Sequence, residues 1–109
     1  MRPSHLSSAA VQLLNSLVER SGLDKDRISI GRFQSVDWQS LTFTGERHEI
    51  SLRMAGPDAA HALALMRSGL AEAEWRLVGH VVADILIVAE TAAPDGSITV
   101  AIEALTLSD

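Results

Sequence analysis

The sequence contains no cysteine and no tyrosine, and aromatic side chains make up only 4% of its 109 residues. Without cysteine, disulfides, thiolate zinc sites, iron–sulfur clusters and cysteine nucleophiles are all excluded. Because aromatic residues are scarce, the hydrophobic core must be built from Leu, Val, Ile and Ala side chains. These absences narrow both the chemistry and the packing that the chain can use.

Basic residues are also few and scattered. Nine Lys and Arg stand against fourteen Asp and Glu, which gives a net charge of −5. A surface that binds nucleic acid needs clustered Lys and Arg to displace counterions from the phosphates. Because no such cluster occurs, we expect no nucleic-acid partner and no binding to membrane surfaces.

Long apolar runs are missing as well. No stretch approaches the roughly 18 residues that a membrane-spanning helix needs. Polar Gln12 and Asn15 interrupt the first apolar stretch, so we expect no signal peptide there. With 47% hydrophobic and 21% charged residues, the composition is that of a globular domain. We expect a single domain over 1–109, with pseudo-halves of about 1–55 and 56–109, in a cytoplasmic, bacterial-type protein.

Two segments are predicted as amphipathic helices, and each ends in Arg-Ser-Gly-Leu, at 20–23 and 67–70. Apolar residues recur at helical spacing in both segments: Ala10, Leu13, Leu14, Leu17 and Val18 in the first, and Ala59, Leu63, Met66 and Leu70 in the second. The candidates for capping the first helix are Ser4, Ser7 and Ser8. Gly22 and Gly69 are expected to end the helices in the left-handed conformation, and the next leucine folds back. The tetrapeptide alone therefore predicts two helix ends and does not prove a duplication.

Alternating apolar and polar residues predict a half-buried strand near the end of each half. A shift of 48 residues aligns the apolar positions Ile50, Leu52 and Met54 with Ile98, Val100 and Ile102. Turn-forming residues at 44–47 and 93–96 precede these strands and predict two β-hairpins. The apolar phase slips between Val36/Trp38 and Leu41/Phe43, which predicts a bulge near 37–39, with a short turn there as the alternative.

Together these elements predict an α+β fold, a two-layer αββαββ pseudo-repeat with a four-stranded antiparallel sheet and two helices on one face. The order is a cyclic permutation of the ferredoxin-like βαββαβ order, and the two layers are similar to those of small pterin carbinolamine dehydratases. That resemblance implies fold alone. Those enzymes carry adjacent histidines in the active site, whereas the histidines here are isolated, at His5, His48, His61 and His80. We therefore do not expect their activity.

The stretch WRLVGHVVADILIVAE, residues 75–90, is predicted as one long strand that is largely apolar on both faces. If the helices cover one face, the other face needs a different cover. Exposed apolar patches of this kind usually mark interfaces. We therefore expect a homodimer or higher oligomer that buries Val78, Val82, Leu86 and Val88. A loop or the C-terminal strand is the alternative cover.

His80 and Asp84 are the polar pair on that same predicted face, in apolar surroundings that can shift a pKa. Four residues along a strand span roughly 13 Å, so the two side chains do not hydrogen-bond to each other. They are the weak candidates for an acid–base site between subunits, as in a small lyase or isomerase. In the alternative interpretation His80 is a satisfied interface histidine and Asp84 pairs with an arginine across the interface.

Glu46, His48 and Glu49 combine oxygen and nitrogen ligands near the first predicted turn. Adjacent strand residues point to opposite faces, so His48 and Glu49 do not chelate together, and we expect a solvated hairpin end. No phosphate-binding or hydrolase motif occurs, and we expect no metal and no cofactor. The sequence favours a non-catalytic oligomeric interaction or structural module. A small-molecule binding module and the lyase- or isomerase-type enzyme are the alternatives.

Overall fold

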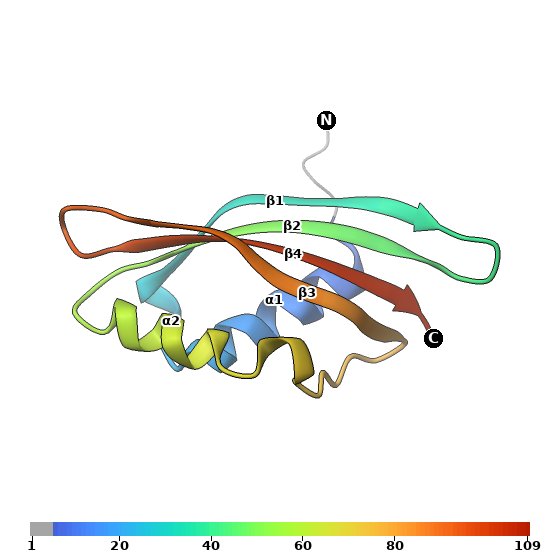
Figure 1. Ribbon diagram of the computed structural model, residues 1–109, viewed down its shortest axis with the longest axis horizontal. Coiled ribbons are helices and arrows are strands. Elements are labelled where there is room, and N and C mark those ends of the chain that lie inside the picture. Colours follow the sequence, from blue (N-terminus) through green and yellow to red (C-terminus); the bar gives the residue numbers. More distant parts are fainter. Residues whose placement is uncertain (1–5) are drawn as a thin grey trace.

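Two layers form the computed structural model, which describes residues 6–109: a four-stranded sheet and two helices on one of its faces (Figure 1). The elements in chain order are α1 (Ser8–Ser21), β1 (Ile28–Gln39), β2 (Thr44–Met54), α2 (Ala59–Arg67), β3 (His80–Ala92) and β4 (Ile98–Ser108). Short 3₁₀ helices at Lys25–Arg27 and Leu70–Glu72 follow the two α-helices. The predicted α+β class and element order are confirmed. Neither α1 nor α2 is long and apolar enough to cross a bilayer.

A glycine in the left-handed conformation follows each helix, as predicted: Gly22 is the C-cap of α1, and Gly69 comes directly after Ser68, the extended C-cap of α2. Gly22 has a φ of 75° and Gly69 a φ of 63°. At the start of α1, the Ser7 hydroxyl accepts a hydrogen bond of 3.1 Å from the Ala10 N–H. Ser7 is therefore the cap, and the candidate Ser4 lies outside the described residues.

The arginines of the two Arg-Ser-Gly-Leu segments have different partners. Arg20 donates from Nε to the Met66 carbonyl at 2.9 Å and from Nη2 to the Ser68 carbonyl. These carbonyls lie at the C-terminal end of α2, where the helix dipole favours a cation. Arg67 instead forms an ion pair with Glu90 on β3. The repeated tetrapeptide thus places a left-handed glycine after both helices, but the cap is Gly22 in one and Ser68 in the other. Its arginine contacts a helix in one half and the sheet in the other.

The strands lie in the order β1-β2-β4-β3 and are antiparallel throughout. Each hairpin contributes one edge strand and one inner strand, and β2 pairs with β4 in the middle. Leu52 on β2 pairs with Val100 on β4, which lies 48 residues later. The same shift maps the start of β2, Thr44, to position 92, six residues before β4 begins at Ile98. The internal duplication therefore stays a prediction.

The core lies between the helices and one face of the sheet, which we call the helix-side face. It is aliphatic, as the composition requires, and its most buried large side chains are at most 2% exposed: Leu13, Leu17, Ile50, Leu52, Met54, Met66, Val100 and Ile102. Burial of one such side chain stabilises the folded state by about 1.5–3 kcal/mol. No helix among the described residues covers the opposite face, which we call the outer face (Figure 1).

The first hairpin turns at 40–43 and not at 44–47 as predicted. A hydrogen bond of 2.8 Å from the Ser40 N–H to the Phe43 carbonyl closes the turn. The Ser40 hydroxyl accepts hydrogen bonds from the N–H groups of Thr42 and Phe43, so a side chain stabilises a turn that contains no glycine. The residues at 44–47 begin β2 instead.

The second hairpin starts later than predicted. β3 begins at His80, and Trp75 lies in the preceding loop, where its partly buried ring packs against the core. The turn predicted at 93–96 is confirmed, since the Gly96 N–H donates to the Ala93 carbonyl at 2.9 Å.

Bulges in both edge strands change which residues share a face. The register of β1 shifts between Ile30 and Phe33, whereas residues 37–39 pair regularly with 44–46, so the predicted irregularity at 37–39 is wrong. The register of β3 shifts between Val82 and Asp84, and again between Ile87 and Ala89. An extra residue in one strand reverses the alternation of faces beyond it.

We predict that the close approach of β2 and β4 at Gly45 forbids a side chain there. A Cβ at Gly45 would collide with the Thr106 carbonyl oxygen, whereas at Gly31 it would lie 3.4 Å from the Ser51 hydroxyl. Gly45→Ala should lower the free energy of unfolding by about 1–3 kcal/mol, because the strands must separate. Gly31→Ala, the matched control, should change it by less than about 1 kcal/mol. Chemical denaturation measures both, and equal stability of the two variants would contradict the close approach.

Candidate functional site

The two candidate catalytic residues lie on opposite faces of the sheet. His80 pairs with Ser108 on the helix-side face, and Asp84 pairs with Leu105 on the outer face. The extra residue between them, Ala83, reverses the alternation. The prediction that both share a face is wrong, and within one chain they do not form a common site.

Two of the four apolar residues predicted for an interface lie on the outer face. Leu86 and Val88 are 43% and 46% exposed. Val82, in contrast, packs against the core on the helix-side face, so its predicted placement is wrong because of the same bulge. Val78 precedes β3, and its N–H donates to the Gln12 side chain of α1 at 2.7 Å, so it lies with the helix layer. The other proposed cover, the C-terminal strand, is an inner strand of the sheet and leaves the outer face open.

Near the β3–β4 turn, the two faces of the sheet have the usual polarity. A row of residues paired across the sheet faces the helices and is apolar: Ile28, Met54, Ile98 and Ala92. The next row faces outward and is polar: Ser29, Arg53, Thr99 and Thr91. This end of the sheet buries its helix-side face and leaves its outer face to water.

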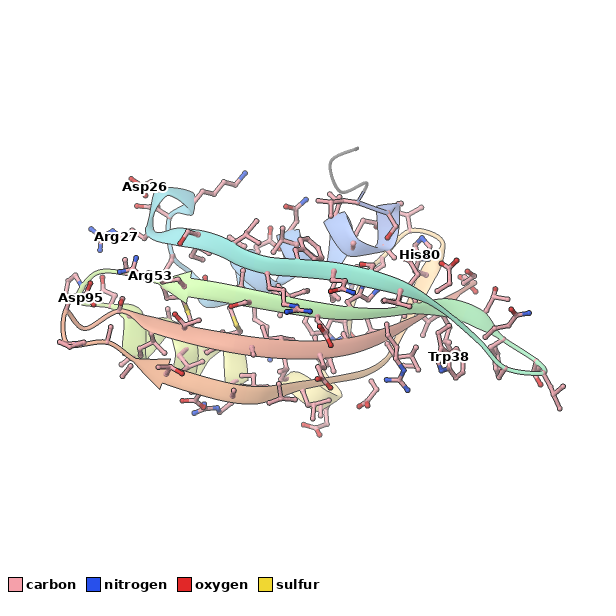
Figure 2. The ribbon with its side chains drawn as sticks, turned by 90° about the horizontal axis from the view of Figure 1, so that it is seen from above. Asp26, Arg27, Trp38, Arg53, His80 and Asp95 are labelled. Atoms are coloured by element: carbon pink, nitrogen blue, oxygen red, sulfur yellow. The ribbon has the colours of Figure 1, made fainter. Side chains whose placement is uncertain are left out.

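Near the β1–β2 turn the polarity is inverted. One paired row on the helix-side face is mostly polar: Asp37, Glu46, Thr106 and Val82. The adjacent outer row is apolar apart from a glycine: Trp38, Gly45, Leu107 and Val81. Figure 2 looks onto the outer face, with Trp38 and His80 near one end and Arg53 and Asp95 at the other.

Six residues form what we call the outer apolar patch: Val36, Trp38, Val81, Leu86, Leu105 and Leu107. Val36 and Val81 are 54% and 50% exposed, although both are apolar residues of paired strands. Only Leu86 of this patch was among the predicted interface residues. The alternation of Val36 and Trp38 with polar neighbours is the sequence signal for the two patch residues on β1.

The polar residues at the same end of the helix-side face line a pocket of about 380 Å³. All four strands and the start of α1 contribute lining side chains: Ser7, Asp37, Glu46, His80, Thr106 and Ser108. The Ser7 hydroxyl donates to Glu46 Oε1 at 2.6 Å while it caps α1. The N-terminal end of α1 therefore lies beside the Glu46 carboxylate.

His48 is buried behind this pocket, and the expectation of a solvated hairpin end there is wrong. Its side chain is 1% exposed, since the actual turn at 40–43 places His48 inside β2 on the helix-side face. Nδ1 lies 2.7 Å from the Ser35 hydroxyl and Nε2 lies 2.9 Å from the Thr106 hydroxyl. Burial lowers the pKa of His48 below its ordinary value of 6.5; Glu46 acts to raise this pKa and His80 to lower it.

The remaining histidines are His5 and His61. His61 is exposed on α2, and His5 lies outside the described residues. Within 6–109, no three His, Asp or Glu side chains gather closely enough to hold a metal ion.

Comparisons of the chain with models of protein families, with curated proteins and with solved structures find no match. The similarity of layers to the pterin carbinolamine dehydratases therefore carries no argument about activity. What this protein does has to be inferred from its two unusual surfaces, the outer apolar patch and the polar pocket.

We predict that His48 makes the fold sensitive to acid. The unfolded chain has a His48 pKa near 6.5, higher than the pKa in the folded protein, so it takes up the proton first as the pH falls. The contribution of His48 to the free energy of unfolding should be fully present above pH 6.5. It should decrease as the pH falls through 6.5 toward the lower pKa of the folded state. His48→Gln keeps a polar side chain near Ser35 and Thr106 but does not titrate, so the decline should be smaller.

Denaturation midpoints between about pH 8 and pH 5 measure this effect. His61→Gln is the matched control, and it should leave the wild-type decline unchanged because His61 is exposed. A decline in His48→Gln as steep as in the wild type would contradict the assignment.

Proposed function

We propose that this protein is a non-catalytic interaction module whose chains self-associate through the outer face of the sheet. The supporting observation is the inverted polarity near the β1–β2 turn. Alternation along a strand marks the face that a protein buries. At this end the alternation marks the outer face, yet Val36 and Val81 are about half exposed in the single chain. A partner that covers the outer apolar patch would bury the apolar side chains that this alternation places on the outer face.

The charges on the outer face favour a second copy as that partner. The whole chain carries a net charge of −5, but the strand residues of this face are balanced. Three arginines accompany three acidic residues there: Arg32, Arg47 and Arg53 with Glu49, Asp84 and Glu103. Two such faces meet without net repulsion, which a strongly charged face would not allow.

The edges of the sheet support face-to-face contact over edge-to-edge pairing. The exposed edges are β1 and β3, and both contain bulges. A bulge interrupts the row of free N–H and C=O groups that an added strand would need. The outer face is the more suitable surface for association.

The proposal also retains a cytoplasmic location and a non-enzymatic role. The lyase- or isomerase-type alternative relied on His80 and Asp84 acting together, and their placement on opposite faces gives it no support.

We predict that Leu86→Lys weakens self-association by at least about tenfold, because a charge then enters the buried face. Lys at position 86 would face Glu103 across the strands, so the fold of the single chain should be kept. The matched control is Leu65→Lys on α2, since Leu65 is 44% exposed and Leu86 43%.

Sedimentation velocity over a concentration series measures the dissociation constant of each variant. The wild type should be dimeric at micromolar concentration, and Leu65→Lys should match it. A wild-type chain that stays monomeric at the highest concentration would sink the proposed function.

A second candidate function is small-molecule binding in the pocket beneath the inverted end. Asp37 and Glu46 are direct cross-strand partners there, and the hydroxyls of Ser7 and Thr106 lie beside them. Asp37 and Glu46 are the two acidic residues of this lining and face each other, so the pocket fits a small organic cation with several N–H donors. Trp38 of the outer apolar patch also lines this pocket, whereas the other five patch residues do not.

We predict that free arginine or putrescine raises the melting temperature, because a ligand that binds only the folded state stabilises it. Glu46→Gln should abolish this shift. Glu49→Gln, on the same strand but the other face, should retain it. Sodium chloride at equal ionic strength controls for screening. The absence of a specific shift with either compound would refute this second function.

A further inference from the structure

Two charged residues of opposite sign flank Leu105 in the outer apolar patch. One row of paired residues crosses the outer face as Val36, Arg47, Leu105 and Asp84. Neither Arg47 nor Asp84 forms an ion pair within 6–109. Elsewhere on this face, Arg32 pairs with Glu49 at 3.2 Å and Arg53 pairs with Asp95 at 3.1 Å.

Leu105 separates the two charges within one chain. Arg47 on β2 and Asp84 on β3 both pair with Leu105 on β4, so their Cα atoms are two strand spacings apart, roughly 10 Å. A charge that becomes buried in an apolar interface is strongly unfavourable unless it finds a partner of opposite sign. Self-association through the patch would therefore have to pair both residues.

We propose that Arg47 of each copy pairs with the partner subunit's Asp84, about a two-fold axis that runs parallel to the strands. This inference rests on the self-association proposed above. Such an axis reverses the order of the strands in the partner subunit. β2 then lies over the partner's β4, and the partner's β3 lies next to that β4. Sheets pack about 10 Å apart and strands about 4.8 Å apart, so the Cα atoms of the two residues lie roughly 11 Å from each other. The extended side chains of Arg and Asp span that distance together.

The charges also favour this axis over the other two-fold axis that could relate two stacked sheets. A two-fold axis perpendicular to the strands, through the same row, would place Arg47 over Arg47 and Asp84 over Asp84. Like charges in contact oppose such a dimer. The axis parallel to the strands instead forms two identical Arg47–Asp84 pairs and closes the dimer, as an isologous interface does.

Charge reversal tests the pair directly. Arg47→Asp and Asp84→Arg should each weaken dimerisation by at least about tenfold, because each places two like charges together. The double variant Arg47→Asp/Asp84→Arg restores the opposite signs, so it should recover most of the wild-type dissociation constant. Arg76→Asp is the matched control and should have no effect, since Arg76 is exposed in the loop beside α1.

Sedimentation velocity measures the dissociation constants of the wild type and the four variants, and circular dichroism checks that each variant is folded. Arg47→Gln and Asp84→Asn provide milder changes if a reversal unfolds the chain, and each should still weaken the dimer. A wild-type monomer would overturn both this pairing and the proposed function. A wild-type dimer that both single reversals leave intact would overturn the pairing alone. The pairing would also be overturned if Glu103→Arg, used in place of Asp84→Arg, restored the dimerisation of the Arg47→Asp variant.

Discussion

The pairing of β2 with β4 is the contact on which the rest of this structure depends. It joins two hairpins that are each too small to bury a core, and it places Leu52 beside Val100 under the helices. The strands come so close at Gly45 that no side chain fits there. Because the ladder runs the full length of β2, it also aligns the rows that cross the sheet. This ladder fixes which residues of β2 and β4 share a face of the sheet.

The edge strands β1 and β3 pair with the inner strands β2 and β4 along their length only because each edge strand contains a bulge. In β3, the extra residue at Ala83 keeps both Val82 and Ile85 on the helix-side face, although they are three residues apart. The same bulge moves Asp84 to the outer face while His80 stays on the other. A pair that resembles an acid–base site in the sequence is thereby divided between two surfaces with different properties.

Those two surfaces meet at the end of the sheet near the β1–β2 turn, where the helices no longer cover it (Figure 1). The helix-side face becomes polar there and contains the pocket with Glu46, and His48 is buried behind it. The outer face becomes apolar at the same rows. One sheet thus has an apolar patch on one side and a polar pocket on the other, and Trp38 borders both.

The sequence by itself determined the features that depend on near neighbours. The left-handed glycines that follow the helices, the second turn and the αββαββ order were all predictable, because capping, turn chemistry and periodicity act over a few residues. Only the tertiary structure decided the burial of His48, the separation of His80 from Asp84 and the extent of the outer apolar patch. Each of these depends on strand register, and register depends on pairing between residues that are distant in the chain, such as Asp84 with Leu105. A single inserted residue in a strand reverses every face beyond it, and nothing in the local sequence at Ala83 distinguishes a bulge from a regular strand.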